Sequence, residues 1–374
     1  MTRRTTLADA IDGGAVRLRW YRADDVPAVR AACDDPLTLR YLPALPEPYT
    51  DADAVWWVAE GAPAAFAVGG GNFAIADPAT DRLVGGIGLS PLQDDEGAVG
   101  YWVAPWSRHR GVATAATRAL TEHALSAGYG RLQLRTDVTN TASQRVALAA
   151  GYVREGVARA ATVDRRGRRR DLIVWSRVAG DPPGPTARHL PDLPGGELTD
   201  GVVRLRPMRA GDAAEVHPVR ASREVVANTV TRRAPSPAET ERYCAGAPAA
   251  WLADRDVRLT VRDAVTGAFA GKVGLQLEDR STAQADLDYY LAPACRGRGY
   301  ATRAVRLLCR WAFTHTAIER LVAGVHVPNL ASQRVLERCG FVREGHERGR
   351  LPDGAGGRTD LYTYALLRTA DPEY

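Results

Sequence analysis

The feature that most constrains the fold of this chain is an internal repeat, in which five blocks recur 187 to 189 residues further along. Val16–Arg19 returns as Val203–Arg206. The other pairs are Arg108–Thr114 with Arg296–Thr302, Asn140–Val146 with Asn329–Val335, Gly151–Gly156 with Gly340–Gly345, and Asp171–Leu172 with Asp360–Leu361. Because the offset is nearly constant and far longer than a solenoid period, it indicates duplication of a whole domain.

A segment rich in proline and glycine, from Asp181 to Gly196, separates the two copies and has no periodicity. Such a segment is typical of a linker. We therefore expect an N-terminal domain over 12–178, a linker over 179–198 and a C-terminal domain over 199–369. Duplicated domains commonly keep the interface of an ancestral homodimer, so we expect an internal pseudo-dimer in a monomeric or homodimeric protein.

The composition is that of a soluble globular protein, with 45% hydrophobic and 25% charged residues. No apolar run has membrane-spanning length, and Met1–Ala10 lacks the apolar core of a secretion signal. The five cysteines show no CxxC spacing, which favours reduced thiols in the cytoplasm and no metal site. The net charge of +5 comes with no nucleic-acid recognition motif. We expect neither a membrane nor a nucleic-acid partner.

Both copies predict the same order of elements. A first strand and a helix precede a hairpin, which the pattern places at Asn72–Ala76 with Leu83–Leu89 and at Arg258–Val261 with Ala268–Leu277. A strand ending at Val103 or Leu291 leads through a glycine turn into a helix. A further strand, a short helix starting at Ser143 or Ser332, and two closing strands follow. We predict an α+β fold, with two tandem domains that each have a mixed, mostly antiparallel sheet and helices on both faces.

The motif Arg-x-x-Gly-x-Ala lies between a strand and a helix in both copies. Gly111 and Gly299 permit a positive φ and close approach of a ligand to the backbone. Successive amides in such a turn, together with a helix N-terminus, suit a pyrophosphate. A single glycine loop is more often a plain helix start, but two copies in register with the other blocks favour an anion site.

Both halves resemble the GNAT superfamily of N-acetyltransferases, closest to the branch that acetylates the N-termini of ribosomal proteins. Arg108–Ala113 and Arg296–Ala301 resemble its coenzyme A loop. Asn140–Ser143 and Asn329–Ser332, each followed by Gly-Tyr or Gly-Phe, resemble its second cofactor segment. The resemblance extends over nearly the whole chain and implies acetyl-CoA, or another acyl-CoA, as co-substrate, with no metal.

The resemblance also implies the cofactor contacts. In the first copy they are Val103, Arg108, Arg110, Gly111, Val112, Ala113, Thr114 and Asn140, and in the second Leu291, Arg296, Arg298, Gly299, Tyr300, Ala301, Thr302 and Asn329. The strand ending at Val103 or Leu291 is expected to carry a bulge and to splay from the next strand. The pantetheine arm would lie in that opening, and backbone amides there would bind the thioester carbonyl and the oxyanion.

The acid that protonates the leaving thiolate is not evident. Many relatives have a tyrosine seven residues after the asparagine, where this chain has Ala147 and Leu336. Ser143 and Ser332 match the branch that has serine in this segment. They contact or protonate the thiolate, or they cap their short helices, and the sequence leaves both options open.

Asp286 and Asp288 are candidates for the base, because their spacing places both side chains on one face of a strand. A surface salt bridge explains them equally well. His326, after the next strand, has a suitable pKa, although a structural histidine is commoner there. Glu96 and Asp137 are weaker candidates in the first copy. The first-copy positions that match the other three are Ala98, Gly100 and Asp137.

Asp164–Asp171 predicts a basic hairpin, which either steers an acidic partner or is simply solvated. Taken together, the sequence predicts an N-acyltransferase that acts on a primary amine of a small molecule or peptide by direct attack in a ternary complex. The alternatives are a non-catalytic acyl-CoA sensor or interaction protein, and an O-acyltransferase. Because only the C-terminal copy has Asp286, Asp288 and His326, we expect it to be the more active one.

Overall fold

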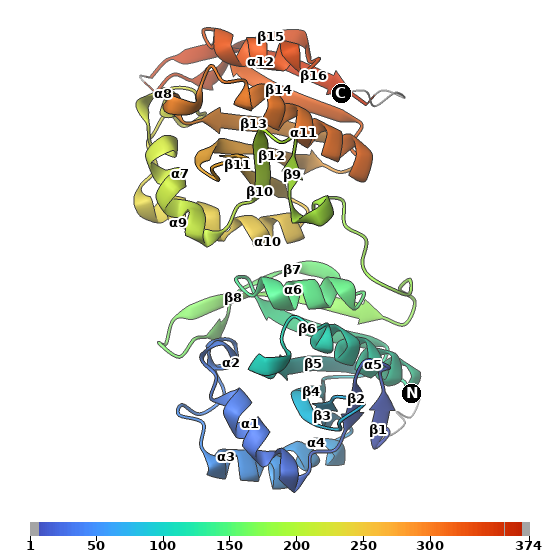
Figure 1. The fold of residues 1–374 in the computed structure, drawn as a ribbon. Coiled ribbons are helices and arrows are strands. Elements are labelled where there is room, and N and C mark those ends of the chain that lie inside the picture. Colours follow the sequence, from blue (N-terminus) through green and yellow to red (C-terminus); the bar gives the residue numbers. More distant parts are fainter. Residues whose placement is uncertain (1–6, 355, 369–374) are drawn as a thin grey trace. The chain divides into compact units, whose positions relative to one another are not determined.

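The computed structural model describes residues 7–354 and 356–368, and the chain divides into two compact units between Ala187 and Arg188 (Figure 1). Residues 1–6, part of the segment searched for a secretion signal, and residue 369, the expected end of the second domain, lie outside the described residues. Both units have the predicted α+β fold.

The first unit contains a sheet of eight strands in the order β1-β2-β3-β4-β5-β6-β8-β7 among its described residues. Within the described part of this sheet, only β5 and β6 pair in parallel. The strands are β1 (Ala10–Asp12), β2 (Arg17–Arg19), β3 (Gly71–Ala76), β4 (Leu83–Pro91), β5 (Glu96–Val103), β6 (Arg131–Asp137), β7 (Val153–Val163) and β8 (Arg169–Val178). The helices are α1 (Val26–Cys33), α2 (Pro36–Tyr41), α3 (Asp51–Trp56), α4 (Ala62–Ala67), α5 (Val112–Ser126) and α6 (Thr141–Ala149).

The second unit repeats this sheet, in the order β9-β10-β11-β12-β13-β14-β16-β15 over the residues described. Its parallel pair is β13 with β14. The strands are β9 (Leu198–Thr199), β10 (Val203–Pro207), β11 (Asp256–Asp263), β12 (Phe269–Asp279), β13 (Gln284–Leu291), β14 (Arg320–His326), β15 (Val342–Pro352) and β16 (Arg358–Leu367). The helices are α7 (Ala213–Arg220), α8 (Arg223–Val226), α9 (Pro237–Ala245), α10 (Ala247–Leu252), α11 (Tyr300–His315) and α12 (Leu330–Arg338).

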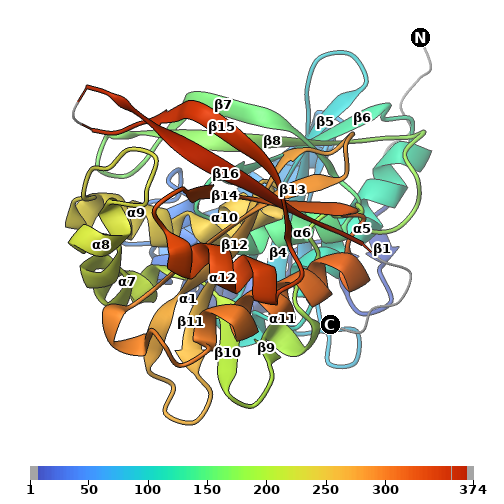
Figure 2. The ribbon, with the colours of Figure 1, turned by 90° about the horizontal axis from the view of Figure 1, so that it is seen from above.

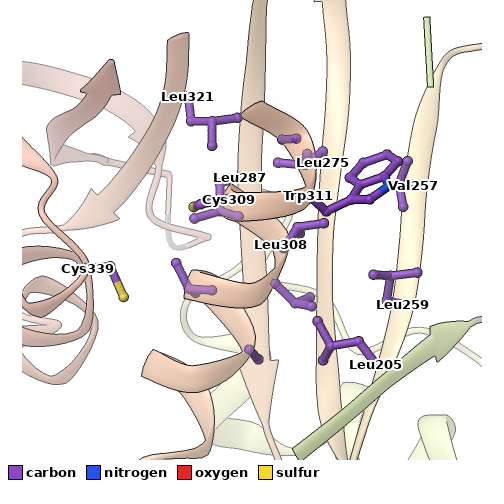
Figure 3. Packing of buried hydrophobic residues seen from close by; sticks show 14 of the residues in the cluster. Leu205, Val257, Leu259, Leu275, Leu287, Leu308, Cys309, Trp311, Leu321 and Cys339 are labelled. Atoms are coloured by element: carbon purple, nitrogen blue, oxygen red, sulfur yellow. The ribbon is translucent and has the colours of Figure 1, made fainter. Parts of the chain in front are cut away.

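One face of the second sheet packs on α11, whose buried residues include Val305, Leu308 and Ala312. Figure 3 shows Leu308, Cys309 and Trp311 of this helix against leucine and valine side chains of five successive strands. Those strand residues include Leu205, Leu259, Leu275, Leu287 and Leu321. The opposite face is covered by α7 and α9, through a smaller cluster around Met208, Val216 and Cys244. Helices therefore cover both faces, as predicted.

The second half of the predicted linker belongs to the second unit. Leu190 and Leu193 are buried in its core, and the N–H groups of His189 and Leu190 donate to the Asp254 carboxylate at 3.0 and 2.9 Å. Burial of two leucines stabilises this segment against the unit. Proline and glycine content alone could not reveal this anchoring.

The strands β15 and β16 run together as a long hairpin, which Figure 2 shows in red. Two register shifts bend it, between Arg343 and Gly345 and between Glu347 and Leu351. In the first unit, β7 and β8 repeat the hairpin with shifts at corresponding places. Among the described residues, no helix is long and apolar enough to cross a membrane.

Candidate active site

The central feature of each unit is the place where two parallel strands separate. In the second unit, β13 pairs with β14 only as far as Asp286, which lies opposite Val322. The last residues of both strands then have no pairing with each other, and in the first unit β5 and β6 separate after Val99 and Leu134. The predicted splay is confirmed. The predicted bulge is wrong for the first unit, where the pairing of β5 with β4 runs from Gly97 to Val103 without a register shift. In the second unit a register shift does occur, between Gln276 and Asp279 of β12, opposite the first residues of β13.

Backbone amides at the end of each splayed strand point into this opening. The N–H of Ala104 donates to the Val84 carbonyl at 2.9 Å, and the N–H of Ala292 donates to the Ala270 carbonyl at 2.8 Å. Alternate residues of an antiparallel strand direct their N–H groups to opposite sides. The N–H groups of Val103 and Leu291 therefore point away from β4 and β12, toward the separated strand.

The glycine loops have the same backbone conformation in both units. Gly111 has a φ of 77° and Gly299 a φ of 76°, and each forms the N-cap of the following helix. His109 and Gly297, two residues earlier, also have positive φ, at 61° and 73°. Alternating left-handed residues before a helix turn successive N–H groups inward and form an anion-binding concavity. The first turn of each helix is formed by Val112, Ala113 and Thr114, or by Tyr300, Ala301 and Thr302.

The arginines of the two glycine loops make different contacts in the two units. Arg108 forms an ion pair with Asp35 at the start of α2 and donates to the Thr38 hydroxyl at 2.9 Å. A phosphate contact of Arg108 would require this ion pair to break. The guanidinium of Arg298 lies 5.0 Å from the ring centre of Tyr300, and Arg110 and Arg296 are exposed. The Tyr300 hydroxyl donates to Asp263, so only its backbone amide faces the loop.

A surface groove of about 510 Å³ lies beside Gly299 in the second unit. It runs along the exposed side of α11 and is lined by four arginines. These are Arg303, Arg306, Arg310 and Arg338. In the first unit only Arg306 has a basic counterpart, Arg118, and the other three positions are Ala115, Glu122 and Ala149. The groove gives the second unit a positive field near its glycine loop.

Each short helix is capped at its N-terminus by an asparagine and not by a serine. The side-chain oxygen of Asn140 accepts from the N–H of Ser143 at 3.1 Å, and Asn329 accepts from Ser332 at 3.2 Å. The helices therefore begin at Thr141 and Leu330, one residue after each cap. The serine-cap alternative is wrong, and both serine hydroxyls are available for another contact.

That contact is a tyrosine of the splayed strand, which sequence reasoning missed. The Tyr101 hydroxyl lies 2.7 Å from the Ser143 hydroxyl, and Tyr289 lies 2.7 Å from Ser332. Burial raises the pKa of both tyrosines. We call these the Tyr–Ser pairs. The signal was present in the repeat, since Tyr101 and Tyr289 occupy matching positions one residue after Gly100 and Asp288.

Asp286 and Asp288 share one face of β13, as their spacing predicted, and this face is opposite α11 because Ala285 and Leu287 pack in the core. Asp288 forms an ion pair with Lys272 on β12, although the lysine side chain is 3% exposed and the aspartate side chain 66%. The salt-bridge explanation therefore holds for Asp288. Burial lowers the pKa of Lys272, but the Asp288 carboxylate outweighs it, so that the net pKa is raised. Asp286 lies two residues closer to the point of strand separation.

The position of Lys272 distinguishes the two units. Its partner across the strands is Tyr290, and the first-unit residue that pairs with the matching Trp102 is Gly86. A Cβ on Gly86 would lie 2.2 Å from the Tyr21 hydroxyl and 2.6 Å from the indole nitrogen of Trp102. The first unit thus fills with aromatic rings a place where the second unit holds a buried cation.

His326 ends β14 and is 7% exposed. Its Nδ1 lies 3.3 Å from the guanidinium of Arg232. Burial and the nearby Arg232 charge lower the pKa of His326. Arginine can only donate, so Nδ1 accepts and the neutral ring carries its hydrogen on Nε2. In this arrangement His326 is a hydrogen-bond donor and not the predicted base.

The first-unit base candidates are also committed elsewhere. The Asp137 carboxylate accepts from Arg170 at 3.2 Å and from the Thr139 N–H at 2.7 Å. Burial raises its pKa, but these donors outweigh burial and hold the pKa of Asp137 below its usual value. Glu96 begins β5, at the end remote from the splay, and forms an ion pair with Arg131 at 2.9 Å.

The basic segment Asp164–Asp171 forms the turn between β7 and β8. Arg165 donates to the backbone carbonyls of Leu39 in α2 and of Leu45 after α2, at 3.0 and 2.7 Å. Arg168 pairs with Asp164 within the turn at 2.9 Å. These contacts hold part of the segment against α2 and the loop that follows it.

The sequence model of the acetyltransferase (GNAT) domain matches residues 15–153 and again 203–342. Among curated relatives, the "Putative ribosomal N-acetyltransferase YdaF" of Bacillus subtilis is 33% identical over 102 residues, which are 27% of this chain and 55% of the relative. The "Probable N-acetyltransferase YjcK" of the same species is 38% identical over 87 residues, 23% of this chain and 48% of the relative. The chain spans about half the length of these relatives.

Among solved structures, the spermidine N-acetyltransferase of Vibrio cholerae in complex with CoA and spermine is 23% identical. The match covers 45% of this chain and 96% of that one, with a TM-score of 0.41. The two family matches together extend over most of the sequence. The chain belongs to the acetyltransferase (GNAT) family and contains two tandem GNAT domains.

Proposed function

We infer that the protein transfers an acetyl group from acetyl-CoA to an amine. The observation that carries this proposal is the combination, in both units, of a left-handed glycine at a helix N-terminus with an open strand edge next to a Tyr–Ser pair. The first feature suits a pyrophosphate and the second suits an amide-containing arm. A strand edge and an anion site joined by one short loop fit a coenzyme A thioester.

The residues present fit that co-substrate. A Cβ built on Gly111 or Gly299 would meet no other atom within 4 Å, so the backbone of each loop is accessible to a ligand. The loop amides would hold the pyrophosphate, and Arg110, Arg296 or Arg298 would add charge. The arginine groove beside Gly299 favours tighter binding of a phosphorylated ligand in the second unit.

The chemistry proposed is a direct transfer. The amine nitrogen forms a bond to the thioester carbon, and the carbonyl oxygen becomes an oxyanion that the N–H of Val103 or Leu291 stabilises. The carbon–sulfur bond then breaks, and the sulfur takes the electron pair. The Tyr–Ser pair supplies a proton to the thiolate, because a tyrosine with a raised pKa stays protonated near neutral pH. The ammonium proton leaves to solvent or to Asp286, which lies on the sheet face opposite α11; we call this face the acceptor face.

The test is release of free thiol from acetyl-CoA in the presence of candidate amines. Following the names of the relatives, the panel contains a peptide with a free N-terminus and spermidine, together with free amino acids. Peptides that contain serine and have a blocked N-terminus serve as hydroxyl acceptors. We expect amine-dependent thiol release and an acetylated amine in the mass spectrum. Binding of acetyl-CoA without thiol release would favour a sensor, and an ester product would favour O-acyl transfer.

A further inference from the structure

The second unit contains two buried N–H groups without an acceptor among the described residues, and they belong to two side chains that contact each other. One is Nε2 of His326, which must carry the ring hydrogen because Arg232 donates to Nδ1 at 3.3 Å. Within the described part of the chain, this Nε2 has no hydrogen-bond partner, although the residue is more than nine-tenths buried. A buried donor without an acceptor is costly, so the group indicates a place for a ligand oxygen.

The second group is Nε of Arg232, which is also buried and has no hydrogen-bond partner among the described residues. The same guanidinium donates to the Asp353 carbonyl at 3.2 Å as well as to His326. No carboxylate in the described ranges forms an ion pair with Arg232. A partly buried guanidinium held by neutral acceptors keeps its full positive charge for a ligand.

The segment that carries Arg232 is fixed in place. Arg232 itself has a φ of 46°, which is the left-handed region and uncommon for arginine. A few residues earlier, the Asn228 side-chain oxygen accepts from Asn329, the N-cap of α12, at 3.0 Å. Such strain persists where the surroundings hold a side chain in one position. The Arg232–His326 pair is therefore preorganised.

The pair lies on the acceptor face of the sheet. Leu321, Ala323 and Val325 of β14 point into the core against α11. By the alternation of a strand, His326 lies on the opposite face, which is also the face of Asp286. The strand end that carries His326 is the part that has separated from β13. The glycine loop and α11 are thus on the other side from the two donors.

The first unit provides a contrast within the same molecule. The residue at the position of His326 is Asp137, and protein donors from Arg170 and Thr139 satisfy it. The residue at the position of Arg170 in the second unit is Thr359, which cannot supply that charge. After duplication, one copy has a closed ion pair here and the other has unfilled donors.

We propose that Arg232 and His326 bind a carboxylate of the acceptor, so that the second unit acetylates an amine of the amino-acid type; this rests on the proposed function. A carboxylate has two acceptor oxygens for two donors, and its single negative charge matches one guanidinium beside a neutral imidazole. A phosphate dianion would lack a second cation at this pair.

The experiment compares acids with their amides. Full-length protein carrying Gly111→Val, which removes the first unit's loop, is assayed with acetyl-CoA, the common amino acids and the matching α-carboxamides. We expect kcat/KM for the preferred acid to exceed that of its amide by on the order of 10²-fold. Arg232→Gln should remove this preference through KM, leaving the amide unchanged. His326→Phe should lower kcat/KM for the acid by about 3–10-fold. His326→Gln, which keeps an N–H near Nε2, should retain most of kcat/KM.

The control is Arg233→Gln, because Arg233 is exposed and pairs with Glu239. It should leave acids and amides unaffected. If the protein with Arg232 and His326 unchanged uses acids and amides equally well, the carboxylate site is overturned but the proposed acetyl transfer is not. Loss of acetyl-CoA affinity in Arg232→Gln, measured by calorimetry, also overturns it, since the pair would then face the co-substrate. No acetylation of either series, while the peptide or spermidine is still acetylated, overturns the carboxylate site alone, and no acetylation of any amine with acetyl-CoA still bound overturns both proposals. Arg232→Lys, which keeps the charge, guards against a folding defect.

Discussion

The hydroxyl of Tyr289 lies 2.7 Å from that of Ser332, and joins the splayed strand β13 to the first turn of α12. Tyr101 and Ser143 form the same contact at 2.7 Å in the first unit. Both domains thus contain a phenol at the opening, although neither has the tyrosine seven residues after the asparagine. The phenol reaches the opening from the strand and not from the helix.

Replacement of the Tyr–Ser phenols should reduce turnover. Tyr289→Phe removes a proton donor, so we expect kcat to fall by roughly 10²-fold for reactions in the second unit, with acetyl-CoA affinity retained. Steady-state kinetics together with calorimetry separate the two effects. Tyr101→Phe is the matched variant. If the C-terminal unit dominates, only Tyr289→Phe should slow the whole protein, and the reverse pattern would assign the activity to the first unit.

Valine at the loop glycines should abolish acetyl-CoA binding one unit at a time. Gly111 and Gly299 have positive φ, so a β-branched residue is strained there by ~1–2 kcal/mol and covers the inward amides. Calorimetry should show the number of sites fall with each variant. Gly167→Val is the control, because Gly167 has a φ of 72° in open space in the β7–β8 turn. Unchanged affinity in the double loop variant would exclude these loops as the phosphate site.

The pH dependence of stability should contain a contribution from His326. Its pKa is lowered in the folded protein by burial and by Arg232, so the unfolded chain takes up this proton at a higher pH than the folded chain. The stabilisation is complete above the usual histidine pKa of about 6.5 and decreases as the pH falls below it. Denaturation at several pH values should show a smaller decrease for His326→Gln than for the natural protein. His315→Gln, at an exposed site, should follow the natural protein.

The buried lysine should depend on its ion pair with Asp288. Asp288→Asn leaves the Lys272 charge buried without compensation, and we expect a loss of ~2 kcal/mol, moderated because Asp288 is largely exposed. Hydrogen exchange of β12 and β13 measures this locally, which avoids assuming that both units unfold together. Adding Lys272→Met should recover the loss. No change in exchange for Asp288→Asn would mean that the lysine is solvated in solution.

Much of the architecture follows from local pattern. The repeat identifies two domains of one family, and the hairpins and the glycine loops are recognisable because their signals are short-range. Alternation along β13 also predicts correctly that Asp286 and Asp288 share a face. The positive φ at Gly111 and Gly299 is confirmed for the same reason, since a turn of this kind is encoded by neighbouring residues.

The assignments of chemical roles required the tertiary structure. His326 reads as a base in the sequence, but Arg232, 94 residues away, fixes its tautomer and makes it a donor. Asp137 likewise depends on Arg170, and the serines depend on tyrosines 42 or 43 residues away. The sequence determined the fold because backbone preference and burial pattern are local. Only the folded chain decided which polar groups are satisfied, because a hydrogen-bond partner is selected by proximity in space and not by separation along the chain.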